Sequence, residues 1–154
     1  MTVKPVIRIQ AEDFDITAEI NSHVSDNKNT GAVVTFTGLC RDENGTLSAL
    51  ELEHYPGMAE TEIGRIAEQA IQRWPVSGLT VIHRYGMIEP GQDIVLVVAT
   101  STHREAAFAA AGFLMDFLKS RAPFWKREHL ADGSKGDWVD TKESDERSLE
   151  KWES

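Results

Sequence analysis

The chain has 154 residues, of which 41% are hydrophobic and 27% are charged. It is acidic, with a formal net charge of -9. This length and composition predict one folded domain over residues 1–154, with an acidic tail from about residue 143. The acidic balance argues against a nucleic-acid binder, because such proteins use lysines and arginines to displace counterions from phosphates. A local site for a small anion is still compatible with this charge.

The sequence gives no sign of a membrane or an export signal. Its apolar runs are shorter than the roughly 20 residues that span a bilayer, and the N-terminal stretch MTVKPVIRIQ has no apolar signal-peptide region. Cys40 is the only cysteine, so it cannot form an internal disulfide, as is usual in a reducing compartment. We therefore expect a cytoplasmic protein that does not bind membranes.

The first half of the chain alternates strand and helix signals. Ile16, Ile20 and Val24 are four residues apart, which places them on one face of a helix. The stretches AVVTFTGL and LSALELEHY flank an Asn44-Gly45 pair, which predicts two strands joined as a hairpin. The expected elements are a strand at 6–10, a helix at 15–24 and strands at 32–39 and 47–55.

The second half continues with two longer helices. An apolar stripe predicts the first helix, which Pro75 ends. The stretch DIVLVVAT is apolar on both faces, which is typical of a central strand. Pro123 disfavours helical geometry at the residue before it and ends the second helix. The expected elements are helices at 58–74 and 103–120 and strands at 79–88, 93–100, 124–130 and 138–141. Together they predict an α+β domain.

A basic cluster, LKSRAPFWKREH, covers residues 118–129 of this acidic chain. Lys119 falls in the last turn of the predicted helix and Lys126 in the strand after it, so the proline turn could bring both to one pocket. Each ammonium would disfavour the charge of the other, which favours an amine that acts as a base or nucleophile near neutral pH. The alternative reading is that Lys119 offsets the helix dipole and that Lys126 pairs with Glu128 on the same strand face.

A second group of cations lies at the start of the same helix. His103 and Arg104 follow the stretch ATST, with Thr102 as the expected N-cap, and the free N–H groups of a helix start favour anions. Arg41 ends the strand over 32–39 and could hold a phosphate. Each of these residues also has an ordinary interpretation, His103 as a solvated histidine and Arg41 as a loop cation.

The two ends of this helix are too far apart to serve one small substrate. Sixteen residues of continuous helix separate His103 from Lys119 by roughly 24 Å. Either there are two sites, or a symmetric dimer brings the start of one helix near the end of the other. We favour the dimer. Fingerprints of nucleotide cofactors and metalloproteases are absent, and the five histidines lack ligand spacing, so we expect no cofactor and no metal.

Several motifs resemble one family over nearly the whole chain, from about Val6 to Asp145. The chain is similar to the large, catalytic subunits of molybdopterin synthases. The stretches that carry the resemblance are GAVVTFTG followed by Arg41, LELEHYPGM, VIHRYG, STHR, FLMDFLK, RAPFWKRE and WVDTKESD.

The resemblance implies an α/β hammerhead-like fold with an added small antiparallel β subdomain. It also implies a homodimer at the core of a heterotetramer, with one small β-grasp sulfur-carrier subunit at each end. The carrier's C-terminal Gly-Gly ends in a thiocarboxylate, whose sulfur passes to cyclic pyranopterin monophosphate to make molybdopterin. The chain would then be a sulfurtransferase of molybdenum cofactor biosynthesis.

The resemblance also assigns roles to individual residues. Lys119 is the first candidate for acid/base or covalent catalysis and Lys126 the second. Phe36, Met115 and Phe124 are candidates for the pocket wall, although Met115 also suits the core. Candidate substrate-binding residues are Leu39, Cys40, Arg41, His103, Arg104, Lys119, Lys126, Arg127 and Glu128.

Two positions depart from the family pattern. Leu39 stands where relatives often carry a basic residue, and Lys142 stands where an arginine is expected, although lysine cannot replace a bidentate arginine contact. Two other classes of function remain as alternatives. One is a non-catalytic adapter that docks a ubiquitin-like carrier, and the other is a regulator that binds a phosphorylated metabolite.

Overall fold

The protein has two sheets and three helices in a computed structural model that describes residues 3–121, 123–139 and 150–153. The larger sheet has the strand order β1-β4-β6-β2, in which β1 runs parallel to β4 and the other neighbours are antiparallel. Its strands are β1 (Val6–Gln10), β4 (Val76–Arg84), β6 (Asp93–Ser101) and β2 (Ala32–Leu39).

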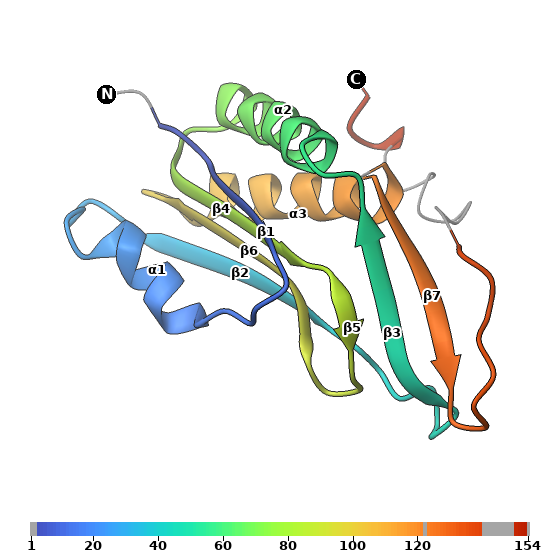
Figure 1. Cartoon of the computed structure of the whole chain (residues 1–154). Coiled ribbons are helices and arrows are strands. Elements are labelled where there is room, and N and C mark those ends of the chain that lie inside the picture. The colour runs from blue at the N-terminus through green and yellow to red at the C-terminus, as the bar shows by residue number, and fades with distance from the viewer. Residues whose placement is uncertain (1–2, 122, 140–149, 154) are drawn as a thin grey trace.

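The smaller sheet is antiparallel, with the order β5-β3-β7. Figure 1 shows β3 and β7 beside the C-terminal end of α3, at one end of the larger sheet. The strands are β5 (Gly86–Ile88), β3 (Leu47–His54) and β7 (Phe124–Leu130), and the helices are α1 (Ile16–Val24), α2 (Met58–Arg73) and α3 (Arg104–Ser120). The expected α+β class with a second, smaller antiparallel sheet is confirmed.

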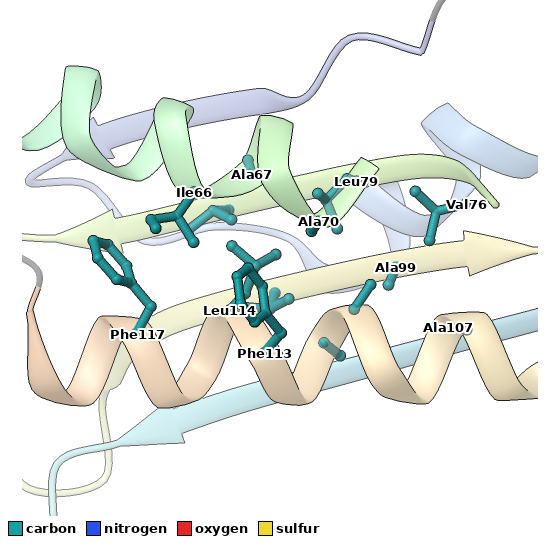
Figure 2. Close-up of a cluster of buried hydrophobic side chains, with 14 of the residues drawn as sticks. Ile66, Ala67, Ala70, Val76, Leu79, Ala99, Ala107, Phe113, Leu114 and Phe117 are labelled. Carbon is teal, nitrogen blue, oxygen red and sulfur yellow. The ribbon is translucent and has the colours of Figure 1, made fainter. Parts of the chain in front are cut away.

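The central strands β4 and β6 of the larger sheet are buried on both faces, to which their alternate residues point. Leu79 and Ala99 belong to the cluster that packs against α2 and α3, which Figure 2 shows together with Phe113 and Leu114 of α3. Ile82 and Leu96 face the other side, where they pack against residues of α1 and the turn before it. The prediction that β6 is a central strand is confirmed, since it lies between β4 and β2.

Gly78 lets α1 approach the larger sheet closely. A Cβ atom at Gly78 would overlap Nδ1 of His23 and would lie 2.7 Å from Oγ1 of Thr100. The His23 ring crosses this position to reach the hydroxyl of Thr80, with Nε2 and Oγ1 2.6 Å apart. The absence of a side chain at Gly78 therefore sets the distance between helix and sheet.

The predicted hairpin over residues 32–55 is wrong. The turn exists, with the N–H groups of Gly45 and Leu47 both donating to the Asp42 carbonyl. The two strands do not pair, because β2 pairs with β6 and β3 pairs with β5 and β7. The turn therefore connects the two sheets, and a local turn signal could not reveal which strand each arm would join.

Two further expectations about strands need correction. The strand predicted over 79–88 is divided at Tyr85 into β4 and β5, which belong to different sheets. Of the strand predicted over 138–141, only Val139 forms a bridge, with Lys126, and residues 140 and 141 lie outside the described part of the chain. The acidic tail expected from about residue 143 lies largely outside it as well.

The last described residues pack back onto the helices. The Trp152 ring lies edge-on to the rings of Trp74 and Phe113, and its Nε1–H donates to Asp116 at 2.6 Å. Arg73 donates to the Trp152 carbonyl at 3.0 Å. No helix in the described ranges is long and apolar enough to cross a bilayer.

Candidate active site

A cavity of about 560 Å³ opens where the two sheets meet the end of α3. It is lined by residues from the end of β2, from β3, β4 and β6, from the last turns of α3, and from β7 and the segment at 136–139. The cavity therefore collects side chains that are far apart in the sequence. Most of the residues expected to bind substrate, and all three expected wall residues, belong to this lining.

The two lysines of the basic cluster both line the cavity. Lys119 is exposed in the last turn of α3, and Lys126 is half-buried on β7. The backbone of Lys126 is held from both sides. On one side it pairs with Leu52 of β3. On the other, the Lys126 N–H donates to the Val139 carbonyl at 3.1 Å, and the Val139 N–H donates to the Lys126 carbonyl at 2.7 Å. The expectation that the turn after α3 brings the two lysines to one pocket agrees with this geometry.

The end of β2 forms another side of the cavity. Leu39, Cys40 and Arg41 all line it. The Arg41 side chain is 82% exposed and its Nη2 lies 3.3 Å from Oε1 of Glu43, so the guanidinium could turn to a ligand at little cost. Cys40 is buried, and this burial raises the pKa of its thiol. The thiol is therefore protonated near neutral pH and is a poor nucleophile.

The three expected wall residues also line the cavity. Met115 is half-buried on α3 and packs against the main core as well, so both interpretations of this residue hold. Phe36 is 39% exposed on β2, and Phe124 begins β7. Apolar walls exclude water and strengthen the electrostatic interactions of the charged groups inside.

The charge of the cavity is mixed. Arg41, Lys119 and Lys126 are its cations, whereas Glu43, Glu128 and Asp137 are carboxylates among the described lining residues. Glu43 already pairs with Arg41. Carboxylates therefore share the cavity with the two lysines of the basic cluster.

The sequence analysis missed His83, a buried residue of the cavity wall on β4. Its ring stacks on Phe124, with centroids 3.8 Å apart and planes 15° apart. The pKa of His83 is lowered to about 4, mainly by burial and also by the nearby charges of His54 and Lys119. The signal that could have found it is a histidine within the continuous apolar strand VIHRYG, since such a position is normally buried.

Three predicted site residues do not line this cavity. His103 and Arg104 stand at the other end of α3, where His103, rather than the expected Thr102, is the N-cap. Arg127 of β7 is not part of the lining, and its guanidinium lies 4.4 Å from the centre of the Trp138 ring. Lys142 lies outside the described residues. His103 and Lys119 therefore lie at opposite ends of α3, as expected.

No group of three or more potential metal ligands occurs within residues 3–121, 123–139 and 150–153. What the cavity offers is ammonium and guanidinium groups next to apolar walls. Such an arrangement can orient an anion and stabilise charge that develops on it.

Comparisons with known proteins agree with this fold. The molybdopterin synthase catalytic subunit of Mesorhizobium japonicum is 65% identical over 150 residues, which cover 97% of this chain and 94% of the relative. The MoaE protein of molybdopterin biosynthesis from Burkholderia ambifaria has a TM-score of 0.83 at 42% identity, covering 96% of this chain and 97% of that one. Molybdopterin synthase from Staphylococcus aureus has a TM-score of 0.78 at 29% identity, and the match covers 86% of this chain and 96% of that one.

The fold likeness extends over both sheets and confirms the expected hammerhead-like architecture. A family model, described as MoaE protein, matches residues 9–121, which is more than half of the chain. This match contains β2 with Arg41 and all of α3 with Lys119. By sequence and by fold, the chain belongs to the MoaE protein family.

Proposed function

We propose that this chain is the catalytic subunit of a molybdopterin synthase, a sulfurtransferase of molybdenum cofactor biosynthesis. The observation that carries the proposal is the meeting of Lys119 and Lys126, from the end of α3 and the start of β7, at one apolar-walled cavity. The relative from Mesorhizobium japonicum is named a molybdopterin synthase catalytic subunit and the one from Staphylococcus aureus a molybdopterin synthase, which supports the same conclusion.

The substrates of this reaction suit the cavity. One is the C-terminal thiocarboxylate of a small sulfur-carrier subunit, and the other is cyclic pyranopterin monophosphate, so both are anions. The lysines orient the two anions and stabilise the charge that shifts as the sulfur attacks the pterin. Lys119 is the first candidate for proton transfer to or from the reacting atoms, and Lys126 holds substrate beside it.

The groups that surround the lysines have supporting roles in this proposal. Arg41 is exposed at the rim, where it can leave Glu43 for the phosphate. Leu39, Cys40 and Glu128 complete the binding surface. The apolar side chains of the wall let a Gly-Gly tail pass while excluding water from the reacting sulfur.

The remaining binding candidates require a second copy of the chain. His103 and Arg104 stand about 24 Å along α3 from Lys119, beyond the reach of one small substrate. A twofold dimer places the start of α3 of one subunit near the cavity of its partner. With one carrier bound to each large subunit, the assembly is a heterotetramer. The single, buried Cys40 suits a reducing compartment, so we place this assembly in the cytoplasm.

The test is a single-turnover assay with thiocarboxylated carrier and cyclic pyranopterin monophosphate. The wild type should form molybdopterin, and Lys119→Ala should lose several orders of magnitude in rate while still binding the carrier. Lys28→Ala is the matched control, since Lys28 is exposed and outside the cavity. Equal rates for wild type and Lys119→Ala would move the chemistry elsewhere. Carrier binding without product from the wild type would indicate an adapter instead.

A further inference from the structure

The loop between α1 and β2, residues 25–31, packs against the turn that opens α3. The Gly31 N–H donates to the carbonyl of Ser101, the last residue of β6, at 3.0 Å. The side-chain amide of Asn29 donates to the hydroxyl of Thr102, with Nδ2 and Oγ1 3.3 Å apart. The second bond joins residues that are 73 positions apart in the sequence, so folding brings the loop and the turn together.

The absence of a side chain at Gly31 allows this close packing. A Cβ atom at Gly31 would overlap the carbonyl oxygen of Thr102 and would lie 3.3 Å from its carbonyl carbon. Both atoms belong to the backbone, which cannot swing aside as the end of a flexible side chain can. A side chain at position 31 would therefore push the loop and the turn before α3 apart.

The turn before α3 is also held from within. Ser101 is buried, and its hydroxyl donates to the carbonyl of His103, the N-cap of α3. Thr102, the N-cap expected from the sequence, instead accepts the amide of Asn29. His103 and Arg104 come next and are exposed. The backbone that carries these two side chains is thus fixed by the turn's own hydrogen bond and by the loop.

We propose that Asn29 and Gly31 are positioning residues for the start of α3. They fix the turn from which the substrate-binding candidates His103 and Arg104 extend. The inference rests on the proposed function for its catalytic meaning, since there these two side chains reach the cavity of the partner subunit. A group that binds substrate across a subunit interface must be held firmly by its own subunit, because a displacement of about 1 Å is costly.

The direct test measures the mobility of the turn by ¹⁵N relaxation of the full-length protein. The backbone order parameters of His103 and Arg104 should be close to ~0.85, the value of rigid backbone. Asn29→Ala should lower them, whereas the order parameter of Lys119, at the other end of α3, should not change. Lys28→Ala, an exposed position in the same loop, is the matched control and should change none of them. Order parameters that stay the same in Asn29→Ala would overturn the inference.

A double-mutant cycle isolates the hydrogen bond between the two side chains. Thr102→Val keeps the shape of the side chain but removes the hydroxyl, whereas Thr102→Ser keeps the acceptor. Asn29→Ala and Thr102→Val should each raise the pterin concentration that gives the half-maximal single-turnover rate by about 2- to 10-fold, the effect of one hydrogen bond. The combined variant should be no worse than either, and Thr102→Ser should resemble the wild type. Additive effects would contradict a shared hydrogen bond.

Gly31→Ala tests the close approach of the two backbones. Its added Cβ displaces the turn, so the half-maximal pterin concentration should rise by about tenfold or more in the folded variant, while the affinity for the carrier is unchanged. Gly64→Ala adds the same methyl group where it meets no atom within 4 Å, and it is the control. A purely structural role for the loop would reduce the amount of folded protein and leave the half-maximal concentration of the remainder unchanged.

The mobility measurement needs no substrate, so the two hypotheses can fail separately. A wild type without synthase activity would refute the proposed function, and the order parameters would still decide whether the loop holds the start of α3. An active wild type whose half-maximal pterin concentration is unchanged by Asn29→Ala and by Gly31→Ala would refute the inference and leave the proposed function intact.

Discussion

Lys126 and Val139 exchange both of their backbone hydrogen bonds, so the free edge of β7 is closed at the position of the lysine. β7 is the last strand of its sheet, and β3 holds only its other edge. Edge residues are less restrained than central ones. The bridge from Val139 therefore fixes the backbone from which Lys126 extends to the cavity.

Replacing Val139 by proline tests this role. Proline removes the N–H that donates to the Lys126 carbonyl at 2.7 Å. We expect the single-turnover rate to fall by about tenfold or more, because small displacements of a substrate-binding group are costly. Val139→Thr keeps the N–H and should retain the wild-type rate. Similar rates for the proline and threonine variants would contradict a positioning role for the bridge.

Mixing two inactive variants tests whether the site is shared between subunits. His103→Ala and Lys119→Ala each damage one end of α3, and in a shared site those ends belong to different subunits. Random reassociation of equal amounts should restore about a quarter of the wild-type activity, since half of the dimers gain one intact site. The separate variants, assayed at the same total concentration, provide the baseline. Activity that never exceeds this baseline would favour sites contained within one subunit.

Alanine should have opposite effects on stability at two glycines, one where α1 approaches the larger sheet closely and one with open space around it. Gly78→Ala should lower the free energy of unfolding by about 1–3 kcal/mol, because its Cβ would overlap the His23 ring and the Thr100 hydroxyl. Gly64 lies within α2, where an added Cβ would meet no atom within 4 Å, so Gly64→Ala should raise it by about 0.5–1 kcal/mol. Denaturant unfolding measures both, and equal effects of the two substitutions would refute the packing argument.

The buried His83 predicts a dependence of stability on pH. Its folded-state pKa of about 4 is below the ordinary value of 6.5, so between these values the unfolded chain binds the proton and the folded protein does not. Stability therefore falls as pH decreases from 6.5 to 4, by about 3 kcal/mol from this group alone. Burial also lowers the pKa of His23, which adds a loss of the same sign.

Denaturant unfolding at several pH values between 4 and 7 measures this loss. His83→Gln cannot take up the proton, so its stability should vary less with pH than that of the wild type, even if it is lower throughout. A comparison with His23→Gln separates the contributions of the two histidines. An identical pH dependence in wild type and His83→Gln would show that His83 is protonated in the folded protein at higher pH than its burial implies.

Much of the local structure follows from the sequence. The helices over 16–24, 58–73 and 104–120 lie within about two residues of their predicted bounds, because apolar spacing and the prolines that end helices are local signals. The expected meeting of Lys119 and Lys126 depended only on a short connection between adjacent elements. The family resemblance added further lining residues, among them Leu39 and Phe36.

The pairing of strands could not be read in the same way. The turn at Asn44-Gly45 has the residues of a hairpin, yet its two arms belong to different sheets because β6 and β7, far along the chain, are their partners. The division at Tyr85 has the same origin, since β4 and β5 pair in different sheets. Local residues determine that the chain turns, whereas long-range burial determines which edges meet.

The helices, the acidic character, the two lysines on either side of the turn after α3 and the family of the chain could all be inferred from the order of the residues. Three features came from the fold: His83 lies against Phe124 at the cavity wall, carboxylates share the cavity with the lysines, and Arg127 lies against Trp138. The physical reason is that charge and helical periodicity are properties of neighbouring residues. The environment of a side chain depends on segments that only folding brings together.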